Sequence, residues 1–247
     1  MDGVLNYMMS PRMEELGDVM VFDLDDTLAP EREFLRSGFR ALKHKLSRTV
    51  GEEFAVEAER RMNEAAERRR NHYSALEKLL EASGLTDSVD MREVVRVCRN
   101  HYPDAGYELR PDARWLLTAL RHAGTTCCLI TDGRSLTQRN KIASLGLYRY
   151  LDPHAIFISG ETGFDKHHAY PFEEVMRRYP GARSYTYIGD NPAKDFLHPR
   201  ALGWKTYMLS DEGRNISPQS LVLPESMLAG EIIDDLSRVF WKNVMWG

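Results

Sequence analysis

The sequence VMVFDLDDT, residues 19–27, joins a short apolar run to three aspartates. Consecutive apolar residues followed by turn formers predict a buried strand that ends at Phe22. In an extended chain Asp23 and Asp25 share one side, whereas Asp26 points away. Neighbouring carboxylates repel each other unless a cation or a shared proton lies between them. The pattern predicts a metal-assisted acidic site, although aspartates in turns and helix caps fit it too.

The bulk composition is that of an ordinary globular protein. The chain has 247 residues, of which 43% are hydrophobic and 28% charged, and its formal net charge of −4 gives no reason to expect a nucleic-acid partner. No apolar run approaches the roughly 20 residues that span a bilayer, and the first 17 residues do not resemble a signal peptide. Cys127 and Cys128 fit packing positions in a strand better than a disulfide framework or a metal site. We therefore expect a cytoplasmic protein without a membrane partner.

Short apolar, β-branched or aromatic runs alternate with helical patterns along most of the chain. This alternation predicts an α/β fold with a Rossmann-like parallel sheet. The predicted strands are Val19–Phe22, Thr126–Ile130, Ala155–Ser159, Tyr185–Ile188 and Lys205–Leu209, and the helices lie near 113–123, 136–145, 171–179 and 192–202. A last short strand is expected within Glu231–Leu236. The apolar residues that follow it suggest docking on the core or on a second subunit, so the chain is expected to be a monomer or a homodimer: Phe240, Trp241, Val244, Met245 and Trp246.

One block interrupts the alternation between the first two strands. Residues 31–104 contain helical patterns and no strand candidate, with an apolar stripe at Leu35, Phe39, Leu42 and Leu46. We therefore predict an inserted all-helical cap domain at 31–110 and a core domain formed by 1–30 and 111–247. The charged run 57–70 is expected to be a solvated helix face, with an anion-binding face as the alternative for its arginines: Arg60, Arg61, Arg68, Arg69 and Arg70.

Further polar groups follow the later strands. Thr131 precedes Asp132 and Gly133, a combination that offers a hydroxyl and free backbone N–H groups to a phosphate oxygen. Lys166 follows the third strand. Asp190 follows the fourth strand, and Asp195 is expected about one turn into the next helix. Because the carboxyl ends of parallel strands share one edge, these groups should meet in a single crevice.

Four such groups in this order make the chain similar to the haloacid dehalogenase (HAD) superfamily, and specifically to its members with a helical cap. The resemblance extends from about Asp18 to Leu209. It implies a Mg²⁺-dependent phosphatase, a phosphoric monoester hydrolase that acts on a small-molecule phosphate ester. By the resemblance Asp23 is the nucleophile that forms an aspartyl-phosphate, and Asp25 is the general acid and base.

The same resemblance implies the remaining roles. Mg²⁺ would be held by the Asp23 carboxylate, the Asp25 backbone carbonyl and Asp190, with Asp195 orienting Asp190 or a metal-bound water. Thr131, Asp132, Gly133 and Lys166 would bind the phosphate. Histidines follow Lys166 where many relatives have proline, so Lys141 is kept as the alternative lysine. Asp26 is interpreted as structural.

The superfamily also contains proteins with functions other than phosphate ester hydrolysis. Dehalogenases that attack carbon lack the acid two residues after the nucleophile, so Asp25 favours phosphoryl transfer. A sugar-phosphate mutase would share every motif, and a non-catalytic metal-binding relative would keep the fold without turnover. The cap should select the substrate. Arg36, Arg134 and the arginines of 57–70 are candidates to bind a second anionic group on it.

Overall fold

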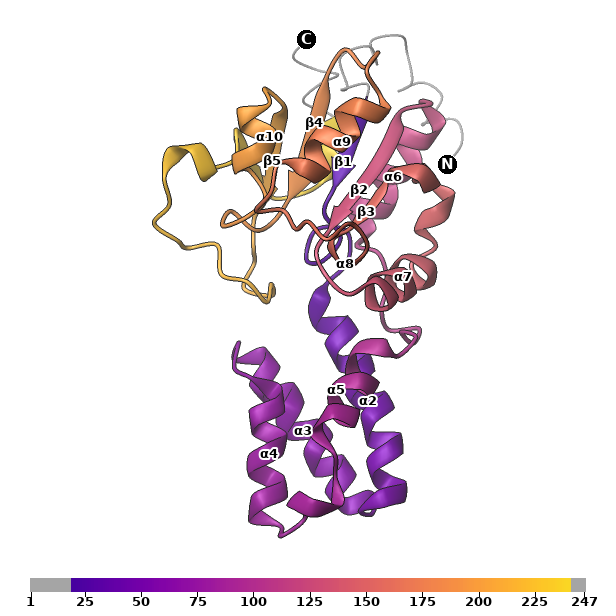
Figure 1. Ribbon diagram of the computed structural model, residues 1–247, viewed down its shortest axis with the longest axis vertical. Helices are drawn as coiled ribbons and strands as arrows, with labels where there is room; N and C mark the ends of the chain where they lie inside the picture. The colour runs from indigo at the N-terminus through magenta and orange to yellow at the C-terminus, as the bar shows by residue number, and fades with distance from the viewer. Residues whose placement is uncertain (1–18, 241–247) are drawn as a thin grey trace.

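A computed structural model describes the structure of residues 19–240 (Figure 1). Within these residues all pairs of neighbouring strands are parallel, in the order β3-β2-β1-β4-β5-β6. The strands are β1 (Val19–Phe22), β2 (Thr126–Thr131), β3 (Ile156–Ile158), β4 (Tyr185–Gly189), β5 (Lys205–Leu209) and β6 (Glu231–Ile233). The predicted parallel α/β sheet is confirmed, with strand ends that differ by at most a few residues.

The central strand β1 is buried on both faces and pairs with β2 and β4. Alternate residues of β1 belong to two apolar clusters, with Met20 and Phe22 on one face and Val19 and Val21 on the other. The flanking helices are α6 (Pro111–His122), α7 (Ser135–Ser144), α8 (Ser159–Thr162), α9 (Tyr170–Arg178) and α10 (Leu197–Ala201). Helix α6 packs into the first cluster and α9 into the second, so both faces of the sheet are covered.

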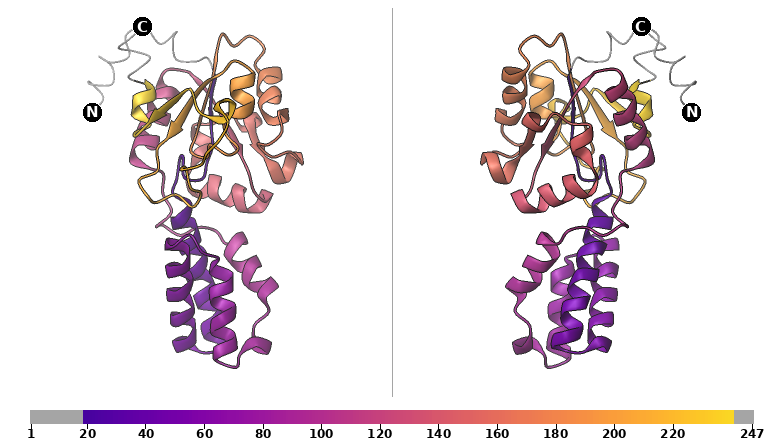
Figure 2. Two further views of the ribbon diagram at one scale, coloured as in Figure 1. Left: turned by 90° about the vertical axis from the view of Figure 1, so that its left-hand side faces the viewer. Right: turned by 90° about the vertical axis from the view of Figure 1, so that its right-hand side faces the viewer.

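A block of four helices follows β1 directly: α2 (Glu31–Thr49), α3 (Glu52–Glu67), α4 (His72–Ala82) and α5 (Met91–Asn100). It has an apolar core of its own, to which Phe39, Leu42 and Leu46 of the predicted stripe contribute. Both views in Figure 2 show these helices beyond the end of the sheet where β1 leads into them. The helical character of the insert is confirmed, and its division from the core at 31–110 remains our proposal.

Short 3₁₀ helices occupy Thr86–Ser88, Leu147–Arg149, Pro153–Ala155 and Glu225–Met227. The predicted helix at 192–202 is shorter than expected, because α10 begins only at Leu197. Asp195 therefore lies in the preceding turn, where its carboxylate accepts the backbone N–H of Asn191 at 2.8 Å. Aspartate side chains commonly compete with helix formation by binding local N–H groups in this way.

Near the carboxyl end of the described chain, β6 confirms the last predicted strand and Phe240 is buried in the core. The other apolar tail residues of the prediction, Trp241, Val244, Met245 and Trp246, lie outside the described residues. Among the helices of residues 19–240, none is both long and apolar enough to cross a membrane.

Candidate active site

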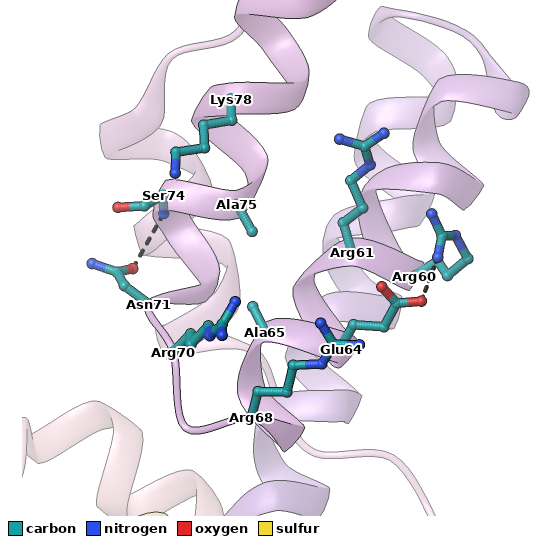
Figure 3. Close-up of a pocket in the computed structure, with 10 residues that line it drawn as sticks. All are labelled: Arg60, Arg61, Glu64, Ala65, Arg68, Arg70, Asn71, Ser74, Ala75 and Lys78. Carbon is teal, nitrogen blue, oxygen red and sulfur yellow. Dashed lines mark hydrogen bonds and ion pairs between the residues drawn. The ribbon is translucent and has the colours of Figure 1, made fainter.

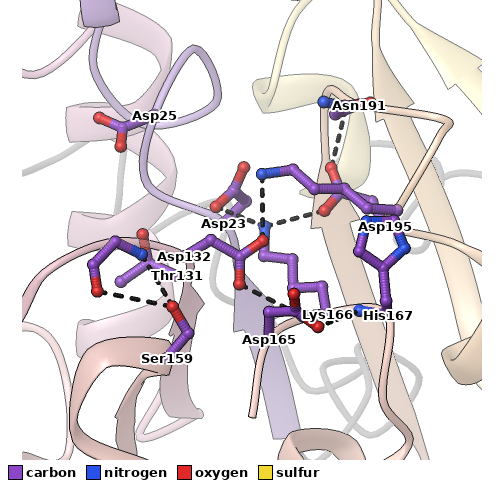
Figure 4. A network of polar contacts seen from close by, with 12 residues as sticks. Asp23, Asp25, Thr131, Asp132, Ser159, Asp165, Lys166, His167, Asn191 and Asp195 are labelled. Atoms are coloured by element: carbon purple, nitrogen blue, oxygen red, sulfur yellow. Dashed lines mark hydrogen bonds and ion pairs between the residues drawn. The ribbon is translucent and has the colours of Figure 1, made fainter. Parts of the chain in front are cut away.

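Asp23 and Lys166 form a buried ion pair at the carboxyl end of β1. The Asp23 backbone N–H donates to Ile188 O at 2.9 Å, which fixes the residue beside β4. Lys166 is fully buried, and its Nζ lies 2.6 Å from Asp23 Oδ1 and 2.8 Å from Asp195 Oδ1 (Figure 4). Burial alone would lower the pKa of Lys166, but Asp195 and Asp23 hold it well above its usual range. Burial raises the pKa of Asp23 to about 6 against the opposing charge of Lys166.

Asp25 has different partners from Asp23. Its Oδ1 lies 2.6 Å from Lys141 Nζ, and its Oδ2 accepts a hydrogen bond from Gln138 Nε2 at 3.1 Å. Gln138 Nε2 also donates to Thr131 Oγ1 at 2.6 Å, so the residues after β1 and β2 are joined through α7. The two lysines thus occupy separate positions. Lys166, the lysine first predicted for the site, contacts Asp23, and the alternative Lys141 contacts Asp25.

Asp190 and Asp195 complete a group of three buried carboxylates with Asp23. One oxygen from each of the three lies within 4.8 Å of the others, a spacing that suits a metal ion. Burial, followed by the charges of Asp23 and Asp195, raises the pKa of Asp190 to about 9. Such crowding is costly without a compensating cation, because buried carboxylates repel each other.

Asp195 does not hydrogen-bond to Asp190, one of the two partners that the sequence suggested; its orientation of a metal-bound water stays a prediction. Its Oδ1 accepts from Lys166 Nζ and from the Tyr187 hydroxyl, and its Oδ2 accepts from the Asn191 N–H. Gly189 makes this close packing possible, since a Cβ there would lie 2.5 Å from Asp195 Oδ2. Asp195 thus holds Lys166 and the turn after β4.

The turn after β2 is held from three directions. The Gly133 N–H donates to Ser159 Oγ at 2.9 Å, and Asp132 Oδ1 accepts the N–H of Lys166 at 3.2 Å. Asp132 Oδ2 lies 3.2 Å from the Nζ of Lys194. The predicted segment Thr131-Asp132-Gly133 is thus brought to the same edge as the other carboxylates. Lys194, which sequence reasoning did not single out, adds a further cation that is partly exposed.

Asp26 adopts a left-handed backbone conformation with a φ of 57°. Its Oδ1 accepts the N–H of Glu31 at 2.9 Å and its Oδ2 accepts the N–H of Ile216 at 2.7 Å. The carboxylate therefore joins the start of α2 to the loop after β5, in keeping with its structural interpretation. Burial raises the pKa of nearby Glu31 to about 7, with a further contribution from the charge of Asp25.

The loop after β5 supports Asp190 and was missed in the sequence. Asn215 Nδ2 donates to Asp190 Oδ2 at 2.8 Å, and Gln219 Nε2 donates to the Asp190 carbonyl at 2.7 Å. Arg69 reaches this loop from the helical block, with Nε 2.9 Å from Asn215 O and Nη2 2.5 Å from Asp211 Oδ2. No periodic pattern marks these residues, so only their amide and carboxylate chemistry could have suggested a role.

Two adjoining pockets lie at this edge of the sheet. The inner pocket, of about 90 Å³, is lined by Asp23, Asp190, Lys194, Thr131 and Ser217 among others. The outer pocket, of about 290 Å³, extends between the core and the helical block. They share Asp25, Glu31 and Asp132, so one opens into the other.

The arginine-rich run of α3 faces a different hollow. Arg60, Arg61, Arg68 and Arg70 line a groove of about 460 Å³ between α3 and α4 (Figure 3). Arg60 and Arg61 are paired with glutamates of the same helix. The groove shares no lining residue with the inner or outer pocket. The alternative that these four arginines face the crevice is therefore wrong, whereas Arg69 contacts the core loop.

The sequence profile of the haloacid dehalogenase-like hydrolases matches residues 18–215, most of the chain. The chain belongs to this family. Among curated proteins, it is 28% identical over 195 residues to the glyceraldehyde 3-phosphate phosphatase of Methanopyrus kandleri, covering 76% of this chain and 81% of that protein. It is 27% identical over 140 residues to the phosphoserine phosphatase of Thermus thermophilus, covering 56% of this chain but only 53% of that protein, about half its length.

Solved structures of HAD-family proteins share the fold at low sequence identity. The HAD-hydrolase YfnB of Bacillus subtilis, whose structure was determined bound to magnesium, superposes with a TM-score of 0.60 at 18% identity. The superposition covers 90% of this chain and 96% of that one. HAD-family membership accounts for the parallel core.

Proposed function

We propose that this HAD hydrolase is a Mg²⁺-dependent phosphatase that cleaves a small phosphate monoester through an aspartyl-phosphate. The observation that carries the proposal is the buried pairing of Lys166 with Asp23, a carboxylate that lines the inner pocket together with Asp25, Thr131 and Asp190. A carboxylate and a lysine ammonium at one point suit attack on phosphorus, because the cation offsets the charge of the incoming phosphate.

The donor set fits a hard divalent cation. The carboxylates of Asp23 and Asp190 and the backbone carbonyl of Asp25 would hold Mg²⁺, which prefers oxygen ligands and retains several waters. Burial raises the pKa of both Asp23 and Asp190, and the charge of Asp23 raises that of Asp190 further. A bound cation would favour the ionised form of both carboxyl groups. When bound, the ion would neutralise charge between the nucleophile and the phosphate oxygens.

The chemistry would proceed in two displacements at phosphorus. A carboxylate oxygen of Asp23 forms a bond to phosphorus while the bond to the leaving-group oxygen breaks, and Asp25 donates its proton to that oxygen. Asp25, now ionised, takes a proton from a water molecule, whose oxygen attacks phosphorus and releases Asp23 and inorganic phosphate. Gln138 and Lys141 orient the Asp25 carboxylate for both proton transfers.

Supporting groups would bind the phosphoryl oxygens. The Lys166 ammonium, the Thr131 hydroxyl and backbone N–H groups of the turn at Asp132 and Gly133 are suited to this purpose. Asp195 would act through Lys166 and through the turn at Asn191. Lys194 adds positive charge on the other side of Asp132.

The test is phosphate release from p-nitrophenyl phosphate and a panel of small phosphate esters. Release should require Mg²⁺, disappear in EDTA and fall by at least about a thousandfold in Asp23→Asn, since no nucleophile remains. Asp25→Asn should reduce release from esters with poor leaving groups more than release from p-nitrophenyl phosphate. Substantial turnover by Asp23→Asn would overturn the mechanism. Transfer of phosphate within one sugar, with little net release, would indicate a mutase instead.

A further inference from the structure

The outer pocket lies where the leaving group of a phosphate ester would extend. It shares Asp25, Glu31 and Asp132 with the inner pocket, and Asp25 is the proposed proton donor to the leaving-group oxygen. Its walls come from the helical block and from the core. Side chains on these walls should therefore determine which leaving groups the protein accepts. This inference rests on the proposed phosphatase function.

Two arginines line this pocket from opposite sides, Arg99 from α5 and Arg134 from the turn after β2. Burial raises the pKa of Tyr73, and hydrogen bonding and charge from Arg99, together with the charge of Arg134, oppose that rise. Both guanidinium groups thus lie near the Tyr73 hydroxyl, which also lines the pocket. Within residues 19–240 neither arginine forms an ion pair with a carboxylate.

The three acidic residues that line the pocket do not neutralise Arg99 or Arg134. Asp25 is paired with Lys141, and Asp132 with Lys194. The third carboxyl, Glu31, forms no ion pair with either arginine within residues 19–240. The two arginines therefore present positive charge to whatever enters the pocket.

We propose that the outer pocket binds a second anionic oxygen group on the substrate, held by Arg99 and Arg134. The substrate class is then a phosphate monoester whose leaving group carries a carboxylate or a further phosphate. Arg36, which the sequence also suggested for this role, is paired with Glu33 and Glu67 instead and does not line the pocket.

A matched substrate pair tests this selection directly. 3-Phosphoglycerate and glycerol 3-phosphate differ only by a carboxylate in place of a hydroxymethyl group. The wild-type protein with Mg²⁺ should prefer the first in kcat/KM by about tenfold or more, the usual effect of hydrogen bonds to a charged group. Glucose 1,6-bisphosphate against glucose 6-phosphate provides the corresponding test for a second phosphate. Equal values within both pairs would overturn the proposal.

Substitutions assign the preference to the arginines. Arg99→Gln and Arg134→Gln should each reduce the ratio of kcat/KM for the preferred pair by about tenfold, mainly through a higher KM. Arg92→Gln is the matched control, because Arg92 is an exposed arginine of α5 that does not line the pocket. An unchanged ratio in both Arg99→Gln and Arg134→Gln would refute the assignment.

Binding separates this proposal from the proposed function. Calorimetric titration of Asp23→Asn protein with the same four compounds, in the presence of Mg²⁺, measures the affinity ratio without turnover. Suppose that the wild-type protein hydrolyses none of the esters, but Asp23→Asn binds the compound with the extra anionic group about tenfold more tightly in each pair. The phosphatase proposal then fails and the proposal of the anion site stands. If the wild type hydrolyses the esters but the affinities within each pair are equal, the phosphatase proposal stands and the proposal of the anion site fails.

Discussion

Lys166→Met would leave two buried carboxylates without the cation that they share. Methionine has nearly the same length as lysine, so the variant removes the charge with little change of packing. Asp23 is 4% exposed and Asp195 is fully buried, and both lie within 2.8 Å of Lys166 Nζ. Removing one partner of a buried ion pair costs about 3–5 kcal/mol, because the remaining charge is uncompensated. We expect a loss in this range at pH 8 in EDTA.

The loss should depend on pH in a defined direction. Burial already raises the pKa of Asp23 to about 6, and loss of the Lys166 charge removes a cause that lowers it. A carboxyl whose folded-state pKa is raised binds more protons in the folded than in the unfolded state, so it destabilises as pH rises. The cost of Lys166→Met should therefore be smaller at pH 5 than at pH 8.

Urea unfolding followed by circular dichroism at both pH values measures these differences. Lys205→Met is the matched control, because Lys205 is an exposed lysine on β5, and it should change the unfolding free energy by less than about 0.5 kcal/mol. The double variant Lys166→Met, Asp195→Asn should be more stable than Lys166→Met alone, since it leaves one buried carboxylate fewer. A cost below about 1 kcal/mol at pH 8 would refute the reasoning.

Three further changes test other parts of the site. Gly189→Ala should lower activity at least tenfold and stability by about 1–3 kcal/mol, because the new Cβ meets Asp195 Oδ2, whereas Gly181→Ala, with nothing within 4 Å, should change neither. Glu31→Gln should raise the unfolding free energy in EDTA by about 1–2 kcal/mol at pH 8 and leave it unchanged at pH 4, because burial raises the Glu31 pKa to about 7 and the charged form destabilises the fold. Mg²⁺ at about 100 times its Kd should raise the Tm of the wild type by about 5–10 °C but not that of Asp190→Asn, as differential scanning fluorimetry would measure. An equal Mg²⁺ shift in the variant would contradict the proposed ligand role.

The core of the fold could be predicted because its strands are continuous apolar runs. Val19–Phe22 and Lys205–Leu209 were predicted with the bounds that the structure has. Parallel strands buried on both faces give such runs, and the turn residues that follow mark their carboxyl ends. The position of Asp23, Thr131 and Asp190 at one edge follows from that topology. Their catalytic and metal-binding roles remain proposals.

The contacts between these groups could not be predicted, because they depend on side-chain direction across long sequence separations. Lys166 and Lys141 could not be distinguished until their distances to Asp23 and Asp25 were known. The predicted start of the helix near Pro192 was wrong, because α10 begins only at Leu197. Residues 191–195 form a turn in which the Asp195 N–H donates to Asn191 O and the Asp195 carboxylate accepts the Asn191 N–H. Asn215 contacts Asp190 from a loop that carries no periodic signal.

The contact of Arg69 with the loop after β5 has a mechanical consequence. Arg69 lies in the short connection between α3 and α4 with a φ of 53°, a conformation that costs non-glycine residues energy unless their surroundings hold them in it. Its guanidinium binds Asn215 O, and the Asn215 amide binds Asp190. If the helical block rotates away from the core, one of two things must happen. Either the hydrogen bond between Arg69 and Asn215 O breaks, or Asn215, which hydrogen-bonds to Asp190, moves with the block. As long as the Arg69 contact holds, opening the crevice and loosening the carboxylates at its base are one movement.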